Sequence, residues 1–201
     1  MPHEFTSQQI LHLLSEAKKE SERDWLMILV AFIHALRATE VVGGWNRRKN
    51  KQTGKIEKIY WPGIHAANIV GSKLVLSRLK NSNPVEDDLF ESENPLLNER
   101  AALIALCRKT PPNQRLFPIT SRTFQRKMHA YGKLAGLPEL FCHPHTLKHS
   151  ILEQLRLSGM DLAEIQDRGG HKNMNSLRVY LNPKKSVVAA KVTKHLASIG
   201  V

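Results

Sequence analysis

The chain has 201 residues, 41% of them apolar, which is enough to bury the core of one domain. Thirty Lys and Arg against 18 Asp and Glu give a net charge of +12, which favours a polyanionic partner such as nucleic acid. Because there is no apolar run of about 18 residues and no signal-peptide pattern, we expect a cytoplasmic protein with no membrane partner. The cysteines, Cys107 and Cys142, are expected to be reduced thiols.

Two helices are predicted at the N-terminal end. Thr6 followed by Gln9 is a capping-box pattern, and the apolar stripe after it predicts a helix over 7–19. Apolar residues at helical spacing then predict one long helix over 22–42, which ends at Gly43-Gly44. Arg37 and Glu40 would lie near the C-terminal end of this second helix.

The next segment is basic. Residues 46–58 are too polar to pack and contain a Thr53-Gly54 turn signal, so an exposed basic loop is expected there. If the polyanionic partner is nucleic acid, such a loop would contact its phosphates. The candidate DNA-binding residues are Arg47, Arg48, Lys49, Lys51 and, further on, Arg78.

The rest of the chain predicts one small sheet and then helices. β-prone runs at 56–61, 68–70 and 74–77, with Gly71-Ser72 as a tight connection, indicate a small antiparallel sheet with Lys80 near a hairpin tip. The helical patterns that follow cover 96–108, 121–135, 145–158, 161–168, 173–180 and 184–198. The fold class is therefore α+β and mainly α-helical.

Four local patterns contain residues suited to phosphate chemistry. They are Arg37-x-x-Glu40, in which the carboxylate can orient the guanidinium; Lys80 in its turn; the run from His143 to Ser150; and Gly169-Gly170-His171, followed nine residues later by Tyr180. Pro144 favours a helix start in the third pattern, which would place His145, Lys148 and His149 on one face. Each pattern alone also fits an ordinary surface, so the argument depends on their order and spacing.

Together these residues have the chemistry needed to attack a phosphodiester. Arg37, Lys148 and His171 are cations that would stabilise the negative charge of the attacked phosphate. Tyr180 supplies a phenolic nucleophile, and His145 is a candidate acceptor for its proton. A covalent phosphotyrosine would conserve the bond energy, so no metal, ATP or other nucleotide cofactor is expected.

The order of the four patterns resembles that of the tyrosine recombinase, or phage integrase, family. His149 and His171 are 22 residues apart and Tyr180 follows after nine more, and both spacings recur in that family. The resemblance implies a site-specific recombinase that cleaves and rejoins double-stranded DNA, with Lys80 as general acid and Glu40 and His149 in support. Residues 1–201 would form one catalytic domain without a separate N-terminal core-binding domain, similar to fimbrial-switch invertases. The helix over 184–198 would dock on a neighbouring subunit in a tetrameric assembly on DNA.

Two residues depart from the family pattern. Lys148 stands where the family has Arg, and ammonium lacks the planar fork of a guanidinium. Gly169 stands where the family has an aliphatic residue.

Three alternatives therefore remain beside a recombinase. The chain could be a DNA-binding relative that does not cleave, or a type IB topoisomerase that relaxes DNA as a monomer. A zinc site on His145, His149 and His171 is disfavoured, because phosphate chemistry accounts for the same residues. Tyr60 and Tyr131 lie outside the four patterns and are expected to be replaceable.

Overall fold

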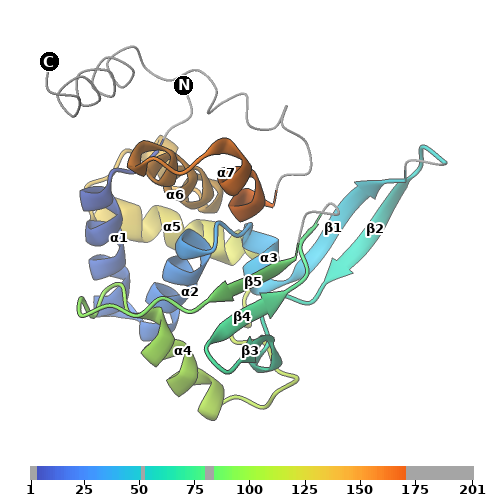
Figure 1. Cartoon of the computed structure of the whole chain (residues 1–201), viewed down its shortest axis with the longest axis horizontal. Helices are drawn as coiled ribbons and strands as arrows, with labels where there is room; N and C mark the ends of the chain where they lie inside the picture. Colours follow the sequence, from blue (N-terminus) through green and yellow to red (C-terminus); the bar gives the residue numbers. More distant parts are fainter. Residues whose placement is uncertain (1–3, 51–52, 80–83, 171–201) are drawn as a thin grey trace, which may run out of the picture.

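The computed structural model describes residues 4–50, 53–79 and 84–170, which form a helical body with two small sheets (Figure 1). Within these ranges no helix is long and apolar enough to cross a membrane. The α-helices are α1 Ser7–Glu20, α2 Glu22–Ile33, α3 Ala38–Val42, α4 Glu99–Arg108, α5 Ser121–Leu134, α6 Pro144–Ser158 and α7 Leu162–Gly169. The strands are β1 Gly44–Lys49, β2 Ile56–Trp61, β3 Ile69–Val70, β4 Lys73–Leu76 and β5 Val85–Asp88, with 3-10 turns η1 Ala66–Asn68 and η3 Glu139–Phe141.

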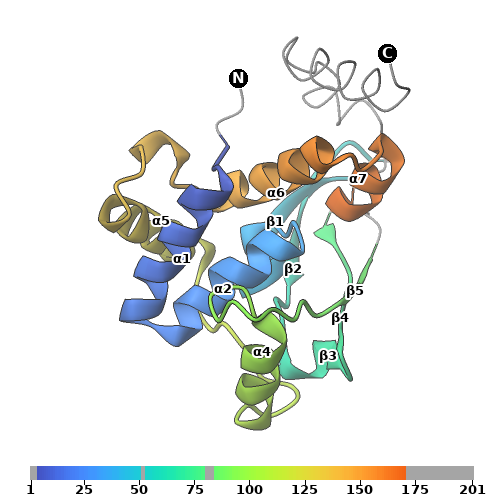
Figure 2. The ribbon, with the colours of Figure 1, turned by 60° about the vertical axis from the view of Figure 1, so that its left-hand side comes forward.

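Helix α2 lies at the centre of the body. Its residues 24–32 are all buried, and α1, α4 and α6 pack against it. Figure 2 shows α6 and α7 side by side across one end of the body, next to α2. The capping box predicted for α1 is confirmed, because Thr6 Oγ1 accepts from the Gln9 amide at 3.2 Å and Gln9 Oε1 accepts from the Thr6 amide at 2.9 Å.

The single helix predicted over 22–42 is wrong. Helix α2 ends at Ile33, and α3 begins only at Ala38. Between them Ala35 has φ of +49°, a left-handed conformation that no helix can continue through. Arg37 is consequently the N-cap of α3 and does not lie near the end of a long helix. No Gly or Pro marks this break, so the sequence pattern does not reveal it.

The exposed loop expected over 46–58 is instead a β-hairpin. Strands β1 and β2 pair antiparallel from Gly44↔Trp61 to Lys49↔Ile56, and Figure 1 shows the hairpin extending away from the helices. Its base is held by a close approach of two glycines with positive φ: a Cβ on Gly63 would lie 2.6 Å from the Gly43 nitrogen. Gly43 also ends the preceding helix, as predicted.

The second sheet has the strand order β3-β4-β5, all antiparallel. The tight connection at Gly71 is confirmed, since Val70 pairs with Lys73 across it. The sequence pattern predicts one sheet without β5, because this strand contains three carboxylates in four residues and has no apolar pattern. Strand β5 pairs with β4, and the segment that connects these two strands contains Lys80.

The later helices follow the prediction closely, with shifts of up to three residues at their ends. Pro144 is the first residue of α6, and glycines in the left-handed conformation, Gly159 and Gly170, cap α6 and α7. Tyr131 of α5 is buried and donates to Asp24 Oδ2 at 2.7 Å, so the expectation that it is replaceable is wrong for stability. The predicted helices over 173–180 and 184–198 lie outside the described residues.

Candidate functional site

Arg37 is held in place by Glu40, as the spacing of the two residues predicts. The Arg37 guanidinium donates to Glu40 Oε1 at 2.9 Å, and the Arg37 amide donates to Oε2 at 2.7 Å. Glu40 is fully buried, whereas the Arg37 side chain keeps 20% of its surface exposed. Glu40 Oε1 also accepts from the Leu79 amide at 3.0 Å. One buried carboxylate thus fixes both Arg37 and the backbone directly before Lys80.

Lys148 is buried and tied to two backbone carbonyls. Its Nζ donates to the Ala35 carbonyl at 3.0 Å and to the Gly169 carbonyl at 2.5 Å. Burial, together with the nearby charges of Arg37 and Arg78, lowers the pKa of Lys148 to about 7. The residue at the position of the family's arginine is therefore an amine whose charge changes near neutral pH.

Two histidines of the third pattern, His145 and His149, lie one turn apart on α6. The His145 and His149 rings contact each other edge to face, with centroids 4.4 Å apart. Helix α6 places His145, Lys148 and His149 on one face, as expected, and this face runs from the exposed His145 to the buried Lys148. Burial and the Lys148 charge lower the pKa of His149, which favours a neutral imidazole there.

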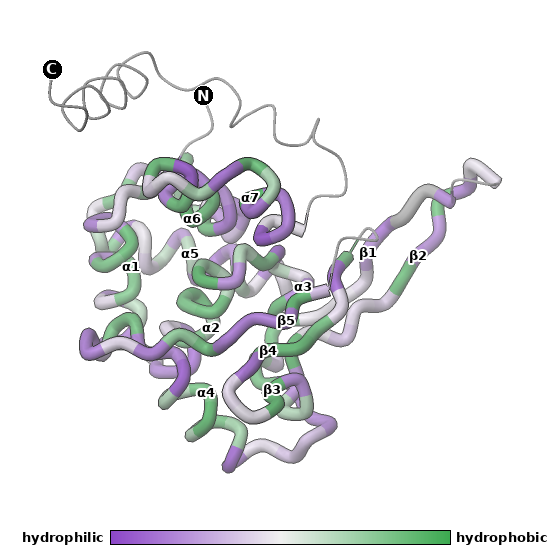
Figure 3. The backbone as a smooth tube through the Cα atoms, in the orientation of Figure 1, coloured by the Kyte–Doolittle hydropathy of each residue, from purple (hydrophilic) through white to green (hydrophobic). Residues whose placement is uncertain are grey.

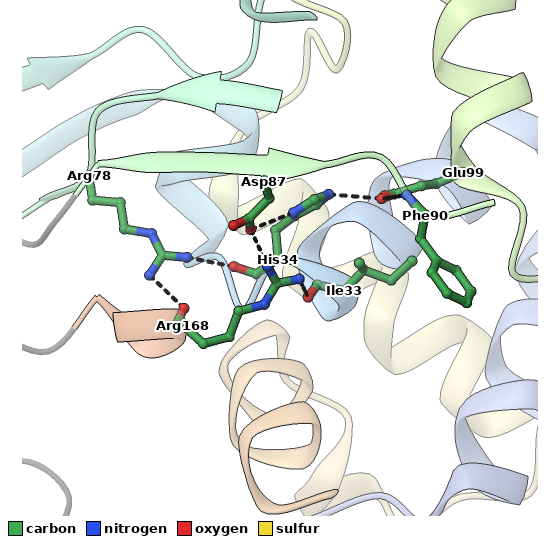
Figure 4. A network of polar contacts seen from close by, with 7 residues as sticks. All are labelled: Ile33, His34, Arg78, Asp87, Phe90, Glu99 and Arg168. Carbon is green, nitrogen blue, oxygen red and sulfur yellow. Dashed lines mark hydrogen bonds and ion pairs between the residues drawn. The ribbon is translucent and has the colours of Figure 1, made fainter. Parts of the chain in front are cut away.

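Three cations bind three successive carbonyls at the end of α2 (Figure 4 shows two of them). The carbonyls of Ile33, His34 and Ala35 accept from Arg168 at 2.5 Å, Arg78 at 2.6 Å and Lys148 at 3.0 Å. Positive charge at this end complements the negative end of the helix dipole. The cations come from α7, the segment after β4 and α6, so the end of α2 joins three parts of the fold.

Arg78 does not lie where a DNA-binding residue is expected. Its side chain is buried, and its second amino group donates to the Arg168 carbonyl at 2.9 Å, so it links the end of α2 to the end of α7. Nε of Arg78 has no partner among the described residues. Arg78 therefore links the two helix ends, and its predicted contact with DNA would require both backbone carbonyls to lose this donor.

A charged network missed by the sequence analysis surrounds His34 (Figure 4). The His34 ring bonds to Asp87 Oδ2 at 2.8 Å and to Glu99 Oε1 at 2.9 Å, and Arg168 forms an ion pair with Asp87 at 2.5 Å. Burial alone would lower the pKa of His34, but hydrogen bonds to the two carboxylates raise it. Burial alone would raise the pKa of Asp87, but the hydrogen bond from His34 and the charge of Arg168 lower it. The sequence signal that could have indicated this network is the acidic composition of strand β5 in a basic chain.

The structure brings together part of the predicted set. Arg37, Glu40, Lys148 and His149 lie around the ends of α2 and α7, and the Lys148 charge acts on His149 while Arg37 acts on Lys148. His145 contacts His149 at the outer side of α6. The remaining candidates lie outside the described residues: Lys51, Lys80, His171 and Tyr180, together with the side chains of Arg48 and Lys49. Among the residues that can be described, no cluster of His, Cys, Asp and Glu is arranged to hold a metal ion.

Comparison with known proteins identifies the family. The model of the phage integrase family matches residues 73–186, more than half of the chain, and the chain belongs to this family. It is 27% identical over 190 residues to tyrosine recombinase XerC of Mannheimia succiniciproducens, and 26% identical over 196 residues to tyrosine recombinase XerD of Haemophilus influenzae. These alignments cover 90% and 92% of this chain but 56% and 59% of the relatives, so the chain spans little more than half their length.

Solved structures share the fold. XerA recombinase aligns over 97% of this chain and 64% of its own, with a TM-score of 0.67 and 17% identity. The Tn1549 transposon integrase, solved in complex with transposon right end DNA, aligns over 96% of this chain and 66% of its own, with a TM-score of 0.58 and 18% identity. The fold class predicted from the sequence, including its similarity to the tyrosine recombinase catalytic domain, is therefore confirmed.

Proposed function

We propose that this chain is the catalytic domain of a site-specific recombinase that cleaves and rejoins double-stranded DNA through a 3′-phosphotyrosine on Tyr180. The observation that carries the proposal is the arrangement of Arg37 and Lys148. Two cations from distant parts of the sequence lie close enough for Arg37 to depress the pKa of Lys148. Burying like charges together is unfavourable, and a phosphate between them would relieve the repulsion.

The roles of the other residues follow from the chemistry of phosphoryl transfer. Arg37, already oriented by Glu40, would donate to the non-bridging oxygens of the scissile phosphate. His171 follows directly after the left-handed cap of α7, Gly170, and would add a further donor. His145 or its ring neighbour His149 would accept the proton of Tyr180, and Lys80 would protonate the leaving 5′-hydroxyl.

Lys148 would act in two ways at this site. Ammonium has three donors, and within the described residues its partners are the carbonyls of Ala35 and Gly169. The third donor would point to a phosphate oxygen. This arrangement would supply charge and position without the two-pronged contact of a guanidinium, so slower cleavage than with Arg is expected.

The relatives suggest the wider setting of the activity. The relatives are tyrosine recombinases, and one structural neighbour, the site-specific recombinase XerH, is bound to its difH substrate in a pre-cleavage complex. We propose that the basic hairpin with Arg47, Arg48, Lys49 and Lys51 contacts the duplex, that the chain is one catalytic domain, and that four copies assemble on the site. The helix predicted over 184–198 would join neighbouring copies, and no metal or nucleotide would be needed.

A DNA-binding relative without cleavage is the second candidate, favoured by the state of Lys148. A side chain that is 1% exposed, tied to two carbonyls and half neutral near pH 7 is a weaker phosphate ligand than a guanidinium.

Covalent trapping on nicked duplex DNA distinguishes the two candidates. The wild type should form a protein–DNA adduct, Tyr180→Phe should form none, and Lys148→Ala should lower the rate of adduct formation far more than DNA affinity. Phe90→Leu, at an exposed aromatic outside both the proposed site and the hairpin, is the control and should form the adduct normally. Equal DNA binding by wild type and Tyr180→Phe with no adduct from either would establish the DNA-binding relative. An adduct that survives in Tyr180→Phe would show that another residue is the nucleophile.

A further inference from the structure

The hairpin β1–β2 exposes its apolar side chains. In the antiparallel register Trp45 faces Tyr60, Arg47 faces Lys58 and Ile56 faces Lys49, so these pairs lie on one face of the ribbon. Trp45 is 69% exposed, Ile56 70% and Tyr60 50%. The opposite face includes Asn46, Ile59 and Trp61, which are half-buried. We call the first set, Trp45, Arg47, Ile56, Lys58 and Tyr60, the outward face.

The aromatic pair of the hairpin, Trp45 and Tyr60, therefore faces solvent. The Trp45 and Tyr60 rings pack edge to face with centroids 5.4 Å apart, and each residue still keeps at least half of its surface exposed. Figure 3 shows that the hairpin bearing this pair projects away from the helical body. Exposed apolar groups gathered on one face of a projecting element usually mark a contact surface.

The charges on the outward face indicate what the partner is. Arg47 and Lys58 lie directly opposite each other, and like charges in this position destabilise a strand pair. A polyanion would convert this repulsion into binding. A second copy of the same face would instead bring four such cations together, which disfavours self-association through it. Duplex DNA is the polyanion that the proposed function supplies.

We propose that the outward face docks in a groove of duplex DNA beyond the cleavage site, an inference that rests on the proposed function of DNA binding. A two-stranded ribbon fits the major groove, whose width is about 12 Å. Arg47 and Lys58 neutralise phosphates at the groove edges, and Trp45, Ile56 and Tyr60 pack against sugars and thymine methyl groups. The hairpin thus contributes affinity that is independent of the catalytic residues.

Duplex binding measured at several salt concentrations separates the two contributions. Arg47→Gln with Lys58→Gln should reduce the slope of log affinity against log salt by about 1.8, since each phosphate contact contributes about 0.9. Trp45→Thr with Tyr60→Thr keeps β propensity and should lower affinity on the order of tenfold at every salt concentration without changing the slope. The matched controls are Phe90→Thr, an exposed aromatic elsewhere, and Arg108→Gln with Lys109→Gln, which should change neither quantity.

Two further measurements exclude a merely structural effect. Trp45→Phe with Tyr60→Phe retains ring packing and should keep most of the affinity that the Thr pair loses. DNA should also shield the exposed Trp45 from acrylamide quenching, and this protection should be absent in Trp45→Phe.

Each contrary result has a definite meaning. Salt-dependent DNA binding that the Trp45 and Tyr60 variants leave unchanged would overturn the docking proposal while the proposed function stands. No duplex binding by the wild type would overturn the proposed function itself. A change in the self-association of the DNA-free chain, with DNA affinity intact, would show that the face contacts protein.

Discussion

The end of α2 and the outward face of the hairpin both reverse the usual rule of burial. At the end of α2, His34, Glu99 and Lys148 are charged or polar groups buried in the body. On the hairpin, aromatic side chains are exposed. The buried charges are compensated within the chain by carbonyls and opposite charges, whereas the exposed rings find no such cover among the described residues. The first region therefore explains stability, and the second calls for a partner outside the chain.

The largest expected effect breaks the buried region. Asp87→Ala removes the carboxylate shared by His34 and Arg168, and leaves Arg168 without its carboxylate and His34 with Glu99 alone. The free energy of unfolding should fall by about 3 kcal/mol or more. Glu86→Ala is the matched control one residue away, since Glu86 is exposed and pairs only with Lys73 among the described residues. Glu86→Ala should lower the free energy of unfolding, measured by chemical denaturation, by less than about 1 kcal/mol. Equal losses for both variants would contradict the network.

The second prediction concerns the charge of Lys148. As pH rises above about 7 the DNA-free chain loses this charge, while Arg at the position keeps it. If the chain cleaves DNA as proposed, the ratio of adduct formation rates, Lys148→Arg over wild type, should therefore rise by about tenfold per pH unit above neutrality. Rates must be measured below saturating DNA, where they report the DNA-free state. If Arg crowds the site, it lowers the rate of adduct formation by the same factor at every pH, and the trend of the ratio is unchanged. A ratio of rates that stays constant from pH 7 to pH 9 would contradict the prediction.

The third prediction follows from the raised pKa of His34. A group whose folded pKa is raised contributes stability that is complete below its unfolded pKa, near 6.5, and lost as pH rises through the folded pKa. His34→Gln should abolish this dependence. Across that window the gap in unfolding free energy between wild type and variant should narrow by up to about 1.4 kcal/mol per pH unit. If the gap is the same at pH 6 and pH 9, the fold does not raise the pKa of His34.

The smallest effect is expected on the hairpin. Trp45→Thr with Tyr60→Thr removes one exposed ring contact, so the free energy of unfolding should change by about 1 kcal/mol or less. Thermal unfolding of the DNA-free chain measures this. A large loss of stability would mean that the outward face supports the fold, and would remove the contrast with the end of α2.

The sequence by itself determined the family and most of the helices, because order, spacing and helical periodicity are local properties of the chain. Arg37 with Glu40, the start of α6 at Pro144 and the fold class were predictable in this way. The left-handed Ala35, the acidic strand β5 and the burial of Arg78 were decided only by the tertiary structure. Each depends on partners far along the chain: the Ala35 carbonyl meets Lys148, and Arg78 meets His34 and Arg168. Only the folded chain sets which carbonyls and charges these residues satisfy, because no periodic pattern encodes a contact across such separations.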